Sequence, residues 1–431
     1  MKTYCYFGLL CLLSFGTLAQ KTRFCANSVC DSIAKAANPQ FLIKKMRYEQ
    51  ALENQINTRQ NFRVVAEIIR IPIVVHIIHN QTSEKVGVGN NISDEQIYSQ
   101  IKVLNEDYRR KVNTLGFNSN PIGADVEIEF FLASIDPNGN PSSGITRSFN
   151  LKNTYNVTNS NDLQTMSNLS YWDSNKYLNI WVATLSSGFI GYGEFPYAEI
   201  IDGLDSEAAE NLDGVYIDHT VFGKKIGTNT KGLYSFGRTV THEVGHWMGL
   251  YHTWGDVVNG GNRCGTDYVA DTPPANGPNS SAFCRVISSN CAGIRTQNLI
   301  ENYMDYSPDS CMNIFTQGQK ERMRAALDLS KRRRRVVNFA KFQLPASSSL
   351  QVVVFPNPTV NNNVQLQVLL PTFQDFVVKI RDIFGREVYT ESFIDLPSTV
   401  VTLKNKDLPA GSYILTVISN GQQIQKRLAL F

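Results

Sequence analysis

Three histidines and one glutamate follow one another at a spacing that suits a metal ion. His242 and His246 are four positions apart, so on a helix both imidazoles lie on one face. Glu243 follows the first histidine and can hold a water against the metal. Gly249 can adopt the positive φ that ends a helix, and the turn then brings His252 in as a third ligand. Three neutral imidazoles and a water make an open tetrahedral zinc site of the catalytic kind.

A surface helix with solvated histidines is the alternative interpretation of this stretch. It explains neither Gly249 nor His252, whereas the extended pattern H-E-x-x-H-x-x-G-x-x-H gives every fixed position a role. The sequence therefore predicts Zn²⁺ as the cofactor.

Length and composition describe a globular protein with several folded units. The chain has 431 residues, 42% of them hydrophobic and 18% charged, so we expect two or three domains. The net charge of +3 is small for this length and argues against a nucleic-acid partner. No internal apolar run is long enough to span a bilayer, so we expect no transmembrane segment in the mature protein.

The amino terminus reads as an export signal. Lys2 precedes an apolar run over residues 6–18, and small residues end it, which predicts a signal peptide over 1–19 cut after Ala19. A buried amino-terminal helix is the alternative. Export implies a secreted or cell-surface protein that passes through the periplasm. In an oxidising compartment the four cysteines around the histidine motif should form two disulfides, with three connectivities open: Cys264, Cys284, Cys291 and Cys311.

The elements that must position the motif can be placed coarsely. Residues 20–62 are polar and helix-prone without a core of their own, which predicts a propeptide. Ser93 and Gln96 mark the start of a helix, and Arg238 begins the metal helix. His76 and His79 read as packing residues in a buried strand. The predicted strands are 69–78, 126–132, 177–182 and 214–218, and the predicted helices are 93–108 and 316–329.

Three further stretches leave alternatives open. The glycine-rich stretch 188–196 suits an exposed edge strand to which a peptide could add itself, or an ordinary hairpin tip. Asp267 and Asp271-Thr272-Pro273 offer hard oxygen ligands for calcium, although a turn with solvated carboxylates is the simpler interpretation. The basic run 331–335 suits a solvated helix end or a protease-sensitive boundary.

The sequence pattern changes after Val336. Residues 336–349 contain a serine run and are predicted to be a linker, and short alternating strands separated by turn signals then predict a small all-β sandwich over 350–431. The predicted strands are 350–354, 364–369, 376–380, 400–403, 413–418 and 424–430.

The chain from residue 63 to about 329 resembles the metzincin metalloproteases and, within them, the pappalysin family. The histidine motif carries this resemblance together with Asn302-Tyr303-Met304-Asp305-Tyr306, which resembles the family's Met-turn. The resemblance implies an α+β catalytic domain over 63–335, with a twisted mixed sheet, long helices, a zinc helix and a loop-rich C-terminal subdomain. It also implies that Met304 lies beneath the metal and that Tyr306 assists catalysis.

The resemblance implies roles for other positions as well. Gly191, Tyr192 and Gly193 match the substrate-binding edge strand. Asp309 falls at the base of the S1′ pocket, where a carboxylate would select Arg or Lys. The resemblance further implies the disulfides Cys264–Cys291 and Cys284–Cys311. It also implies a structural Ca²⁺ held by Asp267, the Val269 carbonyl and Thr272.

The segment Arg23-Phe24-Cys25 is similar to a cysteine switch, in which a thiolate occupies the water position on zinc until the propeptide is removed. A disulfide between Cys25 and Cys30 would silence such a switch. Maturation could be autocatalytic, with cuts before Arg59 or Arg63 and within 332–335.

Residues 350–431 resemble the C-terminal sorting domain of the type IX secretion system. The matching pieces are Phe355-Pro356-Asn357-Pro358, Asp382-Ile383-Phe384-Gly385-Arg386, the stretch 408–413 and the basic end 426–428. The resemblance implies the secretion machinery as a partner.

The sequence thus predicts a secreted zinc endopeptidase, made as a latent zymogen, that cuts protein or peptide substrates with Arg or Lys at P1′. Glu243 would act as general base and then acid. Its own propeptide would be its inhibitor. The alternatives are a non-catalytic adhesion protein on the same scaffold and a zinc amidase acting on cell-wall peptide.

Overall fold

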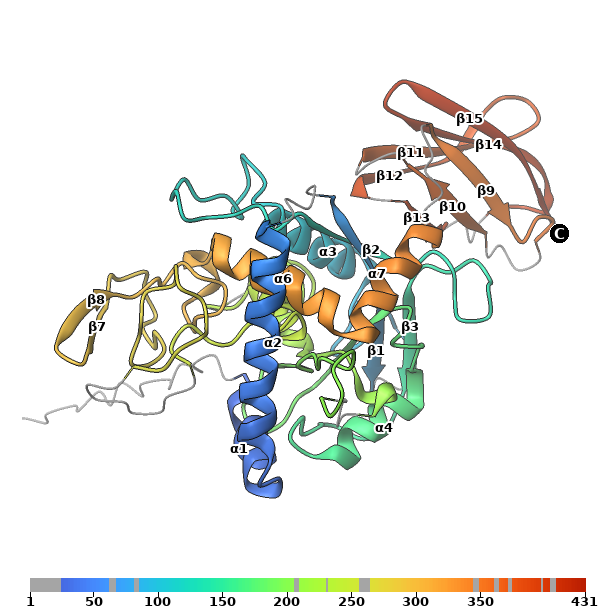
Figure 1. The fold of residues 1–431 in the computed structure, drawn as a ribbon. Helices are drawn as coiled ribbons and strands as arrows, with labels where there is room; N and C mark the ends of the chain where they lie inside the picture. The colour runs from blue at the N-terminus through green and yellow to red at the C-terminus, as the bar shows by residue number, and fades with distance from the viewer. Residues whose placement is uncertain are drawn as a thin grey trace, which may run out of the picture.

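The structure, a computed structural model, describes residues 25–61, 67–80, 85–204, 209–229, 232–255, 264–343, 349–359, 364–370, 374–396, 398–403 and 408–431. The predicted signal peptide over 1–19, together with Arg23, Phe24 and Arg63, lies outside these residues. Figure 1 shows two N-terminal helices lying across a mixed α/β domain, and a β-sandwich beside it. Among the described residues, no helix is both long and apolar enough to cross a membrane.

A six-stranded sheet forms the frame of the first domain. Its order is β2-β1-β4-β6-β5, with β3 also pairing with β1. The strand β1 is apolar on both faces and almost wholly buried, as central parallel strands are. All pairs are parallel except β5 with β6, so the predicted twisted mixed sheet is confirmed. The strands are β1 (Ile69–His79), β2 (Ile128–Leu132), β3 (Ile145–Phe149), β4 (Leu178–Ala183), β5 (Gly191–Gly193) and β6 (Val215–Asp218).

Three helices pack against this sheet and against one another around one apolar core. The Ser93 hydroxyl caps the first by accepting from the Gln96 amide at 3.3 Å, and Thr316 with Gln319 forms a capping box at the third. The three helices are α3 (Asp94–Tyr108), α5 (Arg238–Trp247) and α6 (Gln317–Leu329), and α4 (Ser160–Ser170) lies apart from them. Short 3₁₀ turns are η1 (Glu210–Leu212), η2 (His219–Val221) and η3 (Asp309–Cys311).

The N-terminal segment forms two helices, α1 (Asn27–Ala37) and α2 (Phe41–Asn61). They break at Asn38, which is extended because the following Pro39 disfavours helical geometry there. Figure 1 shows α2 crossing α6, and the apolar side chains of α2 join a cluster built largely by residues of the first domain. The expectation of a helical segment without its own core is confirmed.

The helix α7 (Lys331–Gln343) corrects two predictions. Residues 336–343 are not linker, because they continue this helix and Val336 is buried in the main core. The basic run 331–335 is not a solvated helix end either, since Arg332 and Arg333 are buried and both pair with Asp213. A cut within 332–335 would therefore require α7 to leave the core.

The stretch from Cys264 to Cys311 is mostly irregular, as expected, with one hairpin of β7 (Ser288–Cys291) and β8 (Ile294–Gln297). Two disulfides fasten it, Cys264–Cys291 and Cys284–Cys311, with Cα atoms 5.3 and 5.5 Å apart. This is the pairing that the family resemblance implied. Closing loops of this size stabilises a fold by about 3 to 4 kcal/mol each on the chain-entropy model.

The C-terminal domain is a sandwich of two antiparallel sheets, β13-β10-β9 and β12-β11-β14-β15, around one apolar core. The unpredicted strand is β12, an edge strand with many exposed polar side chains and therefore a weak apolar pattern. The strands are β9 (Gln351–Phe355), β10 (Gln365–Leu369), β11 (Gln374–Arg381), β12 (Glu387–Leu396), β13 (Thr399–Thr402), β14 (Gly411–Ser419) and β15 (Gln422–Leu430).

Candidate metal centre and active site

The three histidines of the motif converge on one point. His242 and His246 lie on α5, and His252 comes from the turn after it. Their Nε2 atoms are 3.2 Å apart (His242 to His246 and to His252) and 3.1 Å apart (His246 to His252). All three side chains are buried. Nitrogen ligands of a tetrahedral zinc ion lie roughly 3.3 Å from one another, given bonds of about 2.0 to 2.1 Å. The donor set therefore fits zinc.

Backbone carbonyls orient two of the rings. Nδ1 of His242 lies 2.7 Å from the Tyr303 carbonyl, and Nδ1 of His246 lies 2.7 Å from the Leu250 carbonyl. A carbonyl can only accept, so each Nδ1 carries the proton and each Nε2 presents its lone pair to the centre. The rings are thus held in the tautomer that binds a metal.

Gly249 ends α5, the predicted zinc helix, as expected. Its φ is +88°, and its amide donates to the His246 carbonyl at 2.8 Å. Leu250 then donates to Gly245 at 3.0 Å, which folds the chain back and presents His252. The His252 ring stacks on Trp254 with centroids 4.4 Å apart.

Met304 packs directly under the zinc helix. A Cβ placed on Gly245 would come within 2.5 Å of its sulfur, so the glycine inside the motif makes room for the methionine. The preceding Tyr303 supplies the carbonyl that orients His242. The structure thus brings the predicted Met-turn to the metal site.

Glu243 is fully buried beside the histidines, facing β5. Cβ atoms built on Gly191 and Gly193 would overlap the Glu243 side chain and carbonyl respectively, so only glycine permits this approach. The strand β5 is the last in the sheet order, which agrees with the predicted edge strand.

Cys25 lies at the same centre. Its sulfur and the three histidine nitrogens all lie within 4.8 Å of one another, and the sulfur is 3.3 Å from Glu243 Oε2. The structure places neither Cys25 nor Cys30 in a disulfide. Burial, followed by nearby carboxylates of which Glu194 acts most strongly, raises the pKa of Cys30 to about 12, so that residue stays a thiol.

The residues around Cys25 occupy the edge of β5. Ala26 donates its amide to the Gly191 carbonyl at 3.0 Å, and Cys25 forms a parallel bridge with Gly191. The Asn27 side chain donates to the Gly193 carbonyl at 2.7 Å and accepts from its amide at 3.2 Å. The main-chain groups that could pair with an added peptide strand are therefore taken by the N-terminal segment.

Tyr306 closes the site from the other side. Its hydroxyl donates to the Cys25 carbonyl at 3.4 Å, and its ring centroid lies 5.0 Å from that of His252. It thus presents a donor to a peptide carbonyl held at the centre.

Asp309 lies at the start of the zinc helix. Its Oδ2 accepts from the backbone amides of Phe236 and Arg238, each at 3.0 Å, and the residue is buried. Because the N-cap residue is Gly237, which has no side chain, Asp309 supplies the missing cap from a distant loop. Its role in substrate selectivity stays a prediction.

Asp267, Val269 and Thr272 meet in one cluster. The Thr272 hydroxyl lies 2.7 and 2.8 Å from the two Asp267 oxygens and 2.8 Å from the Val269 carbonyl. The interpretation of a solvated turn is wrong for Asp267, which is only 4% exposed. Burial raises the pKa of Asp267 to about 6, against the lowering effect of its hydrogen bonds. Asp271 serves elsewhere, accepting from Thr316 at 2.6 Å at the start of α6.

A buried network that the sequence did not reveal ties the zinc helix to β5. Asp213 accepts from Trp247 Nε1 at 3.1 Å and pairs with Arg333. The Arg333 guanidinium also donates to the carbonyls of Trp247 (3.1 Å) and Glu194 (3.2 Å). The only sequence signal for this network was the basic run 331–335, and its composition did not indicate that Arg333 is buried.

Comparisons with known proteins follow the same division of the chain. A family model described as pregnancy-associated plasma protein-A matches residues 160–328, and a model of the secretion system C-terminal sorting domain matches residues 353–430. The first range spans the edge strand, the zinc helix and the Met-turn.

Extracellular metalloproteases are among the similar proteins. One from Coccidioides posadasii is 29% identical over 311 residues, covering 72% of this chain and 93% of the relative. Another, from Arthroderma benhamiae, is 30% identical over 294 residues, covering 68% and 91%.

Solved structures of a Tannerella forsythia protein are also similar. A promirolysin mutant is 35% identical with a TM-score of 0.61, covering 75% of this chain and 100% of that one. Mature mirolysin in complex with a cleaved peptide is 39% identical with a TM-score of 0.54, covering 65% and 99%.

Proposed function

The chain belongs to the pappalysin family of metalloproteases and ends in a secretion sorting domain, and from this premise we propose that it is a zinc-dependent endopeptidase kept latent by residues 25–61. The observation that carries the proposal is the convergence of three buried imidazole nitrogens beside Glu243. The relatives are extracellular metalloproteases, so the protein is a secreted or cell-surface metalloendopeptidase. They lend no support to an adhesion protein or a cell-wall amidase.

His242, His246 and His252 would hold the zinc ion. When bound, zinc acidifies a coordinated water towards a pKa of about 7 and polarises the scissile carbonyl. The two backbone carbonyls that fix the ring tautomers keep the donor nitrogens in place before the metal arrives.

Glu243 is the proposed general base. Its buried carboxylate would take a proton from the attacking water and pass it to the leaving amine. The Cys25 sulfur, 3.3 Å from Oε2, marks a position from which this carboxylate reaches a group at the centre.

The substrate would lie extended along β5. Support comes from the N-terminal segment, which already uses the Gly191 carbonyl and both main-chain groups of Gly193. Tyr306 would hydrogen-bond the developing oxyanion, because its hydroxyl already donates to a carbonyl there.

Latency would rest on Cys25. Its sulfur would be a fourth ligand in place of water, and the segment around it would block the edge of β5. Mature enzyme would form only when this segment is displaced.

Asp309 is proposed to favour Arg or Lys at P1′, and the cluster of Asp267, Val269 and Thr272 to bind Ca²⁺. Support for calcium is the convergence of a buried carboxylate, a carbonyl and a hydroxyl on irregular backbone. The sorting domain would engage the secretion machinery during export.

Cleavage-site profiling of the purified mature protein tests the function. We expect cuts before Arg and Lys in a peptide library, abolished by a zinc chelator. We also expect Glu243→Gln to lower turnover by about 10² to 10⁴, the usual contribution of a general base. Near-normal turnover in Glu243→Gln would remove the residue from its role.

A further inference from the structure

The catalytic domain carries a groove that fits one face of α2. Tyr48, Leu52 and Ile56 recur every four residues, so they form one apolar stripe along the helix. Tyr48 and Leu52 are buried by contact with the catalytic domain, although α2 has no core of its own. The groove is lined by Ala198, Leu204, Ala325, Ala326 and Leu329.

A buried arginine lies in this groove and binds a carboxylate of α2. Arg322 donates to the two oxygens of Glu49 at 2.6 and 2.9 Å, and Tyr251 donates its hydroxyl to the same carboxylate at 2.9 Å. Such a bidentate arginine–carboxylate pair is among the stronger hydrogen-bonded ion pairs. Arg322 is only 1% exposed.

The catalytic domain itself holds this arginine in position. Arg322 Nε donates to the Gly249 carbonyl at 2.8 Å, at the end of the zinc helix. Its guanidinium lies over the rings of Tyr251 (4.9 Å) and Tyr268 (5.7 Å). The carboxylate site is therefore built from residues that remain when α2 is gone.

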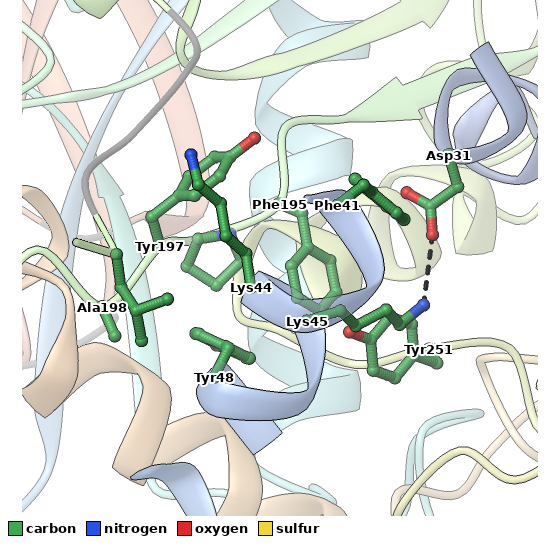
Figure 2. Close-up of a pocket in the computed structure, with 11 residues that line it drawn as sticks. Asp31, Phe41, Lys44, Lys45, Tyr48, Phe195, Tyr197, Ala198 and Tyr251 are labelled. Carbon is green, nitrogen blue, oxygen red and sulfur yellow. Dashed lines mark hydrogen bonds and ion pairs between the residues drawn. The ribbon is translucent and has the colours of Figure 1, made fainter. Parts of the chain in front are cut away.

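Figure 2 shows how the two sides meet next to this pair. Phe41, Lys44, Lys45 and Tyr48 of the N-terminal segment face Phe195, Tyr197, Ala198 and Tyr251 across one pocket. Lys45 lies 4.2 Å above the Tyr251 ring and pairs with Asp31 at 3.3 Å. Farther along α2, Arg59 pairs with Asp328 of α6.

These contacts lie outside the stretch between residues 61 and 67 that joins α2 to β1, so a cut there severs none of them. An emptied groove would leave apolar side chains in water and the Arg322 guanidinium without its carboxylate partner Glu49, which disfavours release.

We propose that this groove is a binding site for an amphipathic helix with a central carboxylate. After a cut before Arg63, its occupant is the excised N-terminal segment of this chain, of which the structure describes residues 25–61. Cutting the chain then does not by itself free the active site. The segment must also be displaced or degraded. The proposal rests on the processing proposed above, and it adds a holding site distinct from Cys25.

The test measures retention and not activity. A recognition sequence for an added site-specific protease replaces residues 62–66 in the full chain, which also carries Glu243→Gln and Cys25→Ser. After the cut, size-exclusion chromatography with mass spectrometry follows how fast the segment leaves. This background removes both proteolysis and the thiol ligand, so a failure here leaves the proposed function untouched.

We expect the cut segment to co-elute with the catalytic domain, and Glu49→Gln to speed its release at least 10-fold. The matched control is Glu53→Gln, an exposed carboxylate one turn further along α2. Immediate release of the cut segment from the parent, which keeps Glu49, overturns the proposal. So do equal release rates in Glu49→Gln and Glu53→Gln. If uncut Glu49→Gln fails to fold, Tyr251→Phe replaces it, and release as slow as in the parent then overturns the proposal.

Discussion

At the scale of single residues, the centre is defined by four possible ligand atoms that lie within 4.8 Å of one another. The three Nε2 atoms and the Cys25 sulfur fix where a metal would lie, and Gly191, Gly193 and Gly245 are the space that permits it. A side chain at any of these three glycines would overlap Glu243 or Met304. Substituting any of them would therefore disturb the site without touching a ligand.

Asp309 offers a test that separates charge from capping. Asp309→Asn keeps an oxygen for the amides of Phe236 and Arg238 but removes the charge. We expect kcat/KM for peptides with Arg at P1′ to fall at least about 10-fold more than for Leu, the cost of losing a charged partner.

The control is Asp309→Ala, which also removes the cap and should cost about 1 to 3 kcal/mol of folding free energy. An unchanged Arg-to-Leu ratio in Asp309→Asn, with the fold intact, would take Asp309 out of the specificity pocket.

Glu194 predicts a pH dependence of stability. Burial raises the pKa of Glu194 from 4.5 to about 7, opposed by the hydrogen bond from Tyr192. A raised pKa in the folded state means that stability is fully present below pH 4.5 and is lost as the pH rises through about 7. Glu194→Gln should therefore leave the unfolding free energy unchanged near pH 4 and raise it by about 3 kcal/mol near pH 8. Denaturant titrations at the two pH values measure this, and a loss at pH 8 would refute it.

Local spacing predicted the residues whose partners are close in sequence. The histidines, Glu243 and Gly249 act within one helix and its turn, so their spacing carries their geometry. Arg322 and Arg333 were not predicted, because their partners Glu49 and Asp213 are 273 and 120 residues away. Nothing in a basic residue's neighbourhood reveals such a distant carboxylate.

At the scale of elements, the zinc helix is held at both ends. Asp309 caps its start, and Asp213 with Arg333 binds Trp247 at its end and reaches the carbonyl that follows β5. Helix and edge strand are thus fixed relative to each other by α7.

Arg333→Met should loosen that arrangement. It leaves part of the buried Asp213 charge uncompensated, which we expect to cost about 3 kcal/mol of folding free energy. Because β5 would be less well placed, KM for extended peptides should rise more than kcat falls. Steady-state kinetics beside thermal unfolding measures both effects. Arg334→Met, at an exposed neighbouring position, is the control. Equal effects of the two substitutions would contradict the role assigned to Arg333.

Elements with a regular apolar pattern were predicted, and those without one were missed. The strands β1, β4 and β6 and the helices α3, α5 and α6 lie within a few residues of their predicted bounds. The missed strand β3 is only half-buried. The helix α7 contains buried arginines, which in the sequence are indistinguishable from charges that face solvent. Burial decides such cases, and burial depends on the whole fold.

At the scale of the whole molecule, the chain divides later than composition suggested. Because Val336 is in the main core and the network of Asp213 depends on α7, the catalytic unit extends to Gln343. The sorting domain has its own apolar core between two sheets, so it is a separate folded unit.

Two truncations test this boundary. A chain ending at Gln343 should keep one cooperative unfolding transition of the catalytic unit, since no core residue is lost. A chain ending at Arg335 removes most of α7, including the buried Val336, and should fail to fold or unfold at least about 10 °C lower, given losses of several kcal/mol. Calorimetry distinguishes the two, and equal stability of both chains would restore the earlier boundary.

The zinc site is tested most directly by elemental analysis of purified protein. The account predicts about one zinc ion per chain in both the parent and Glu243→Gln, and almost none in His246→Ala, since the histidines and not the glutamate bind the metal. Active, homogeneous parent protein without stoichiometric metal would contradict the central claim.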